Sequence, residues 1–76
     1  MSEQHVLDLK GLNCPMPLLK TKQALNQIDV GACLAVLTTD PGSVRDFKSF
    51  IDLTAHELVE FEARDREYYF VIRKGS

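Results

Sequence analysis

The residues best suited to chemistry are in the stretch LNCPMP, residues 12–17, where Cys14 is followed by Pro15 and, two residues later, by Pro17. Pro15 fits the first position of a helix with Cys14 as its N-cap, although Pro17 also permits a helix that starts there. The unpaired N–H groups and the dipole at a helix start stabilise anions and lower the pKa of a thiol. Gly11 permits a close approach or an unusual turn before the cysteine. We therefore expect Cys14 to be an exposed nucleophile, held as a thiolate and supported by Gly11, Pro15 and Pro17.

A structural role for Cys14 remains the alternative, because cysteine is among the residue types most often buried. Cys33 lies in the apolar run ACLAVL and is expected to be a buried core thiol. Two cysteines do not make a disulfide scaffold, and the N-terminal residues lack the apolar segment of a signal peptide. A cytoplasmic location is therefore predicted, in which both cysteines remain thiols.

Metal binding is not expected. His5, Cys14, Cys33 and His56 are spread along the chain without the close ligand pairs of structural zinc sites. His56 is interpreted as a residue at a strand entry whose ring hydrogen-bonds locally. No metal and no organic cofactor is predicted.

The charged residues suggest protein partners and disfavour nucleic acid. The net charge of -2 argues against nonspecific binding to a phosphate backbone, and no stretch is long and apolar enough to span a membrane. Basic residues near the cysteine could dock acidic partner surfaces and favour the thiolate, or simply be solvated: Lys10, Lys20, Lys22, Arg45 and Lys48. Asp40 and Asp46 are interpreted first as helix-cap and helix-face charges, with a secondary role in partner binding.

The apolar pattern predicts six elements in the order β-α-β-α-β-β. Strands are expected within 5–12, 32–39, 57–63 and 67–74, and helices over 18–28 and 43–54, the second capped by Asp40 or Ser43. Residues 1–76 then form a single α+β domain, a two-layer α/β sandwich with a mixed four-stranded sheet and both helices on one face. The outer face of the sheet would carry the glutamates and stay polar.

The sequence resembles the TusA-type sulfur-carrier family, also called SirA-like, over almost its whole length. The resemblance rests on the opening Gly-Leu-x-Cys-Pro-x-Pro, the segment DP…RD, HELV at 56–59 and IRKG at 72–75. It implies the sandwich described above, similar to the C-terminal domain of translation initiation factor 3. It also implies that Cys14 accepts a persulfide sulfur from a cysteine desulfurase and passes it to an acceptor protein.

The resemblance leaves the destination of the sulfur open. In the founding branch the relay leads to 2-thiolation of the tRNA wobble uridine, whereas other branches serve molybdenum-cofactor maturation or other sulfur metabolism. Met16 stands where many tRNA-pathway members carry an acidic residue, and Phe47-Lys48 stands where Ile-Pro is frequent. The relay implies transient complexes with donor and acceptor, and a monomer is expected between them.

Two other classes of function remain as alternatives. One is a non-catalytic RNA- or protein-binding module, although the chain lacks RNP-like aromatics and a GXXG loop. The other is a redox regulator that senses oxidants at Cys14, although no resolving cysteine lies nearby in the sequence.

Overall fold

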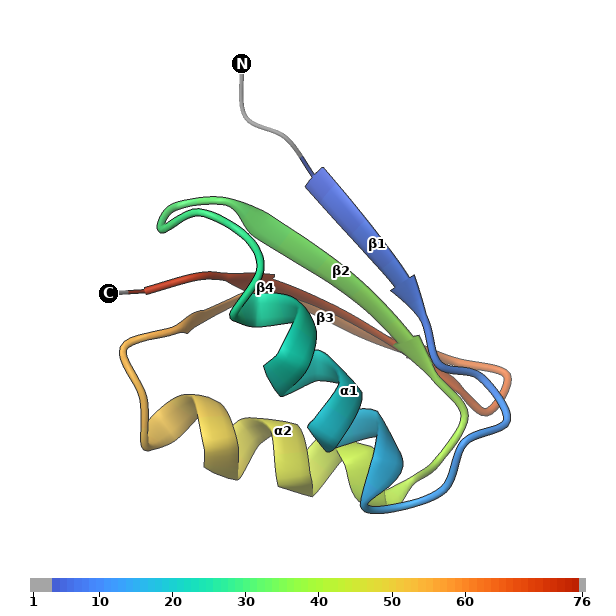
Figure 1. Cartoon of the computed structure of the whole chain (residues 1–76). Coiled ribbons are helices and arrows are strands. Elements are labelled where there is room, and N and C mark those ends of the chain that lie inside the picture. The colour runs from blue at the N-terminus through green and yellow to red at the C-terminus, as the bar shows by residue number, and fades with distance from the viewer. Residues whose placement is uncertain (1–3, 76) are drawn as a thin grey trace.

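The computed structural model describes residues 4–75 and contains a four-stranded sheet with two helices on one face (Figure 1). The elements are β1 (Gln4–Asp8), α1 (Met16–Leu25), β2 (Cys33–Thr38), α2 (Gly42–Asp52), β3 (Glu57–Arg64) and β4 (Glu67–Arg73). The predicted α+β class and element order are therefore confirmed.

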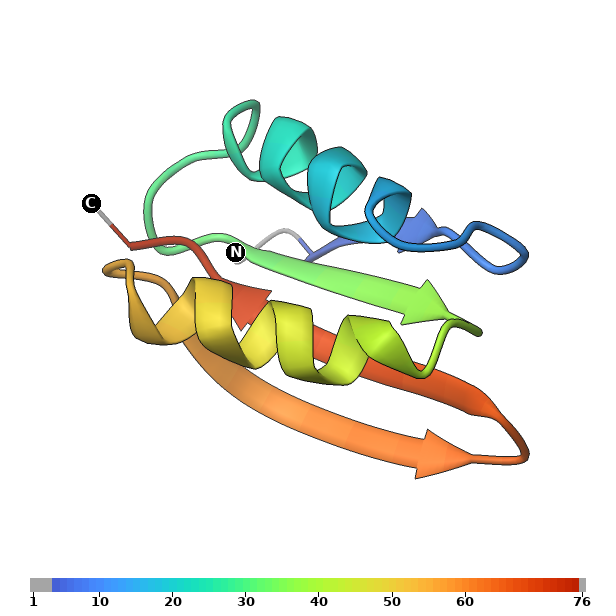
Figure 2. The same cartoon turned by 90° about the horizontal axis from the view of Figure 1, so that it is seen from below.

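The sheet is mixed, with strand order β1-β2-β4-β3. β1 and β2 run parallel because α1 carries the chain back between them, while β4 is antiparallel to both of its neighbours. Since each helix follows a strand of this parallel pair, both helices run in the same direction. Their N-terminal ends consequently lie at the same end of the molecule, as both views show (Figures 1 and 2).

The core lies between the helices and the covered face of the sheet. Phe47 of α2 and Phe70 of β4 are both fully buried, with ring centroids 4.5 Å apart. Helix α1 contributes Thr21 and Leu25, which are buried on the face that the apolar spacing predicted. Packing of these side chains fixes how the two helices lie on the sheet.

The outer face of the sheet differs from its prediction. It has an apolar centre, since Ala35 and Val71 are paired across β2 and β4 and are both buried, and the side chain of Val6 on β1 is 68% exposed. Glu60 and Glu62 are exposed on β3, as expected. The outer face is therefore polar along β3 but apolar at its centre.

Cys33 is not the buried core thiol that the sequence predicted. It is the first residue of β2 and is only partly buried. Side chains alternate between the two faces of a strand, so Cys33 shares the outer face with Ala35, whereas Leu34 and Val36 enter the core. The alternation cannot be seen in the sequence, because the residues of ACLAVL on both faces of the strand are apolar.

The motif residues near the C-terminus build the end of the molecule away from the helix starts. The Gly75 amide donates a hydrogen bond to Nδ1 of His56 at 2.9 Å, and Lys74 Nζ donates to the carbonyl of Ile28 at 2.8 Å. His56 directly precedes β3, as predicted, but the donor to its ring lies 19 positions away in the sequence, so the hydrogen bond is not local. None of the helices in the described part of the chain is long and apolar enough to cross a membrane.

Candidate functional site

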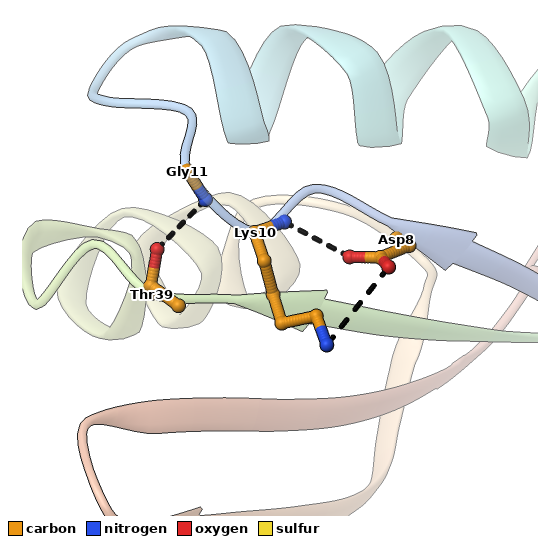
Figure 3. Close-up of polar contacts among 4 residues, drawn as sticks. All are labelled: Asp8, Lys10, Gly11 and Thr39. Atoms are coloured by element: carbon orange, nitrogen blue, oxygen red, sulfur yellow. Dashed lines mark hydrogen bonds and ion pairs between the residues drawn. The ribbon is translucent and has the colours of Figure 1, made fainter.

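The loop between β1 and α1 carries Cys14, and it begins with a turn at Gly11. Gly11 has φ +88°, a conformation that side chains other than glycine rarely adopt, and its amide donates to Oγ1 of Thr39 at 2.9 Å. Lys10 is held against Asp8, through its amide at 3.1 Å and its ammonium group at 4.0 Å (Figure 3). A Cβ at Gly11 would meet no atom within 4 Å, so the turn, and not a close approach, requires the glycine.

Cys14 lies in a tight turn that ends at the first residue of α1. The Met16 amide donates to the Asn13 carbonyl at 2.9 Å, and the Cys14–Pro15 peptide bond within the turn is cis. Pro15 occupies the N-cap position and α1 starts at Met16, so Cys14 precedes the cap. The expectation that Cys14 would be the N-cap is therefore wrong, as is a helix start at Pro17. Pro17 lies in the first turn of α1 and is buried, so it anchors the helix on the core.

Asp40 ties this turn to the start of α2. Its Oδ2 accepts a hydrogen bond from the Cys14 amide at 2.9 Å, and its Oδ1 accepts one from the Gly42 amide at 3.3 Å. The N-cap of α2 is Pro41, so neither Asp40 nor Ser43 is the cap residue that the sequence suggested. Asp40 instead uses one carboxylate to hold two segments together.

The Cys14 thiol itself contacts α2. Cys14 is exposed, and its Sγ donates a hydrogen bond to Oδ2 of Asp46 at 3.0 Å. This hydrogen bond raises the pKa of the Cys14 thiol above its ordinary value. Desolvation and the charges of Asp46 and Asp40 add to the rise, while Arg45 opposes it. The prediction of exposure is confirmed, but the prediction that this turn favours the thiolate is wrong, because the hydrogen bond to Asp46 and the nearby carboxylates favour the protonated thiol.

The predicted basic residues do not gather at the thiol. Among the predicted cations, only Arg45 influences the Cys14 pKa. The Nζ of Lys22 lies 5.2 Å from the ring centroid of Phe50, and the Nζ of Lys48 lies 4.8 Å from that of Phe61, so both cover aromatic rings. Lys20 is exposed on α1, and Lys10 is paired with Asp8 as described.

Asp40 and Asp46 are the residues whose importance the sequence reasoning understated. The sequence predicts capping and helix-surface roles for both, yet both contact Cys14. The available signal was the segment DP…RD, which belongs to the same resemblance as the cysteine motif. Two separate parts of that resemblance therefore meet at one thiol.

Apolar surface borders the site. Met16 and Leu19, both on the first turns of α1, have exposed fractions of 39% and 44%. Exposed apolar side chains beside a reactive group are typical of protein contact surfaces. Within residues 4–75 no group of three or more His, Cys, Asp or Glu is placed to hold a metal ion.

Comparison with known proteins gives one consistent result. The sequence model of the family described as Sulfurtransferase TusA matches residues 5–74. The protein named Sulfur carrier protein TusA from Allochromatium vinosum is 46% identical over 69 residues, which cover 91% of each chain. The similarity spans both the Cys14 turn and the segment that contains Asp40 and Asp46.

Proposed function

Because the chain belongs to the TusA family of sulfur carriers, we propose that Cys14 is the residue that carries the sulfur, as a persulfide received from a cysteine desulfurase. The observation that supports this most directly is the exposure of the Cys14 thiol on a turn that is held by hydrogen bonds. A carrier needs access for two successive partners and a sulfur atom in a reproducible position. Cys14 combines both properties.

Loading is a thiol exchange at sulfur. The Cys14 sulfur forms a bond to the terminal sulfur of the donor's persulfide, and the sulfur–sulfur bond within the donor breaks. The donor cysteine leaves as a thiolate and takes up the proton that Cys14 loses. Cys14 becomes Cys14–S–SH, with no net oxidation and no need for a further reactant.

Unloading repeats the same chemistry with a second protein. A cysteine of the acceptor attacks the outer sulfur of the Cys14 persulfide, and Cys14 leaves as the thiol again. We place the acceptor in the pathway that leads to 2-thiouridine in tRNA, which is the destination of the sulfur in the founding branch of the family that the sequence resembles. Met16 and Leu19 supply apolar contact area for the transient complexes beside the turn.

Mass spectrometry tests the assignment of the carrier residue. We expect incubation with a cysteine desulfurase, its pyridoxal phosphate and cysteine to add about 32 Da, one sulfur atom, to the chain. Cys14→Ser abolishes the addition, whereas the control Cys33→Ser still loads. Loading of Cys14→Ser to the level of the natural sequence would contradict the proposal.

The pathway that receives the sulfur needs a separate test. In cells that lack their own carrier, the chain should restore 2-thiouridine at the wobble position, measured by liquid chromatography of digested tRNA, and Cys14→Ser should not. Loading without restored thiouridine would exclude the tRNA pathway while leaving the carrier function intact.

A further inference from the structure

We propose that Asp46 is a positioning residue that holds the Cys14 thiol fixed and protonated in the free carrier. The inference rests on the proposed function in one respect, since it takes Cys14 as the sulfur-carrying residue. Its structural basis is the 3.0 Å contact between Cys14 Sγ and Asp46 Oδ2, which joins residues 32 positions apart in the sequence. Asp46 would thus set when the thiol can react.

Two independent interactions place Asp46 next to the thiol. Asp46 lies in α2, next to Phe47, whose fully buried ring fixes the rotation of the helix. On the other side, Asp40 holds the amide of Cys14 at 2.9 Å, just before the same helix. Backbone and side chain of Cys14 are therefore both held by the segment 40–46, which leaves Sγ little freedom to turn away.

The charges around the sulfur favour the proton. Asp46 and Asp40 both face Cys14 and oppose ionisation of its thiol, and Arg45 is the group that favours it. Neither carboxylate forms an ion pair with a described residue; the ion pairs there are Lys10 with Asp8 and Arg73 with Glu57. Asp46 therefore contacts the sulfur through one hydrogen bond without an ion-pair partner among the described residues.

The same contact distinguishes the empty carrier from the loaded one. A thiol can donate its proton to Asp46, whereas the persulfide, once Cys14–S–SH has lost its proton, has none to donate and would be repelled by the carboxylate. The loaded sulfur should therefore point away from α2 and into solvent. Asp46 thus favours a protonated, hydrogen-bonded thiol before loading and an outward sulfur afterwards.

The test compares alkylation rates of the free carrier, which involve no partner and no sulfur. Iodoacetamide is applied across a range of pH to the Cys33→Ser background, in which Cys14 is the remaining thiol. For Asp46→Asn we expect the pH midpoint to fall and the rate at neutral pH to rise about two- to fivefold, since the larger thiolate fraction is partly offset by lower nucleophilicity. Asp46→Ser, a second neutral variant, should behave alike, and Asp46→Glu should stay near the parent rate.

Asp52→Asn is the matched control, because it removes the same charge from an exposed position at the other end of α2. It should leave both the rate and the midpoint unchanged. An unchanged or higher midpoint in both neutral Asp46 variants would overturn the proposal, as would an equal shift in Asp52→Asn. Failure of the sulfur-loading assay would instead count against the proposed function and leave these rates unaffected.

Discussion

The Cys14 amide and the Asp40 carboxylate form a hydrogen bond of 2.9 Å that connects the loop before α1 to the start of α2. The same carboxylate also accepts the Gly42 amide. One exposed loop is therefore held by a side chain that belongs to the neighbouring helix start. This arrangement explains how a surface turn can keep a defined shape without being buried.

Asp40→Ala should lower the free energy of unfolding by about 1–2 kcal/mol, because it removes two hydrogen bonds to a charged acceptor. Urea denaturation measures the change. Asp29→Ala is the control, since Asp29 is exposed and its side chain has no such role. Equal effects of the two substitutions would mean that the carboxylate of Asp40 does not hold the turn.

The reactivity of the folded thiol should depend on pH in a particular direction. Because Asp46 and Asp40 raise the Cys14 pKa, the thiol stays protonated to higher pH than an ordinary cysteine. In the Cys33→Ser protein the alkylation rate should therefore level off at higher pH than in a peptide of residues 10–18. A lower midpoint in the protein would show that the helix start dominates instead.

Substitutions at two glycines should have opposite outcomes. Gly11→Ala forces a side chain into φ +88° and should cost about 1–2 kcal/mol of unfolding free energy. Gly42→Ala, at the first residue of α2, places a Cβ in ordinary contact with Asp40 and should be neutral or stabilising by up to about 1 kcal/mol. Thermal or urea denaturation compares the pair, and an equal loss in both would refute the argument from the backbone angle.

Two buried threonines give a second opposed pair. Thr21 is fully buried and its hydroxyl has no hydrogen-bond partner among the described residues, so Thr21→Val should raise the free energy of unfolding by about 1 kcal/mol. Thr38 is also fully buried, but its Oγ1 lies 2.7 Å from Oγ of Ser43. Thr38→Val should therefore destabilise the fold by a similar amount. A loss at Thr21 as large as the loss at Thr38 would show that the Thr21 hydroxyl is satisfied after all.

Much of the fold could be predicted from local pattern. The helix α2 follows from the spacing of Phe47 and Ile51, and the hairpin of β3 and β4 follows from the alternation of Phe61 with its glutamate neighbours. These signals are carried by neighbouring residues, so one sequence is enough to detect them. The face on which Cys33 lies was not predictable in this way, because its apolar run has no alternation.

The hydrogen bond between Cys14 and Asp46, which favours the protonated thiol, could not be predicted from local pattern. Asp46 reaches Cys14 only after α2 has packed against the sheet, and nothing in the residues beside Cys14 records that placement. The features visible in the sequence, which are the helix start and the nearby basic residues, therefore predict the wrong direction for the shift of the Cys14 pKa. The direction of the pKa shift depends on carboxylates that are distant in the sequence, and their positions are known only from the structure.

Cys33 begins β2, whereas Thr39, just beyond the end of that strand, holds the loop that leads to Cys14. Six extended residues span roughly 20 Å, far more than the about 7 Å that a disulfide can bridge between two Cα atoms. The folded molecule therefore cannot form a disulfide between Cys14 and Cys33. Any sulfur–sulfur bond made at Cys14 must join it to another molecule or to a sulfur atom brought from outside.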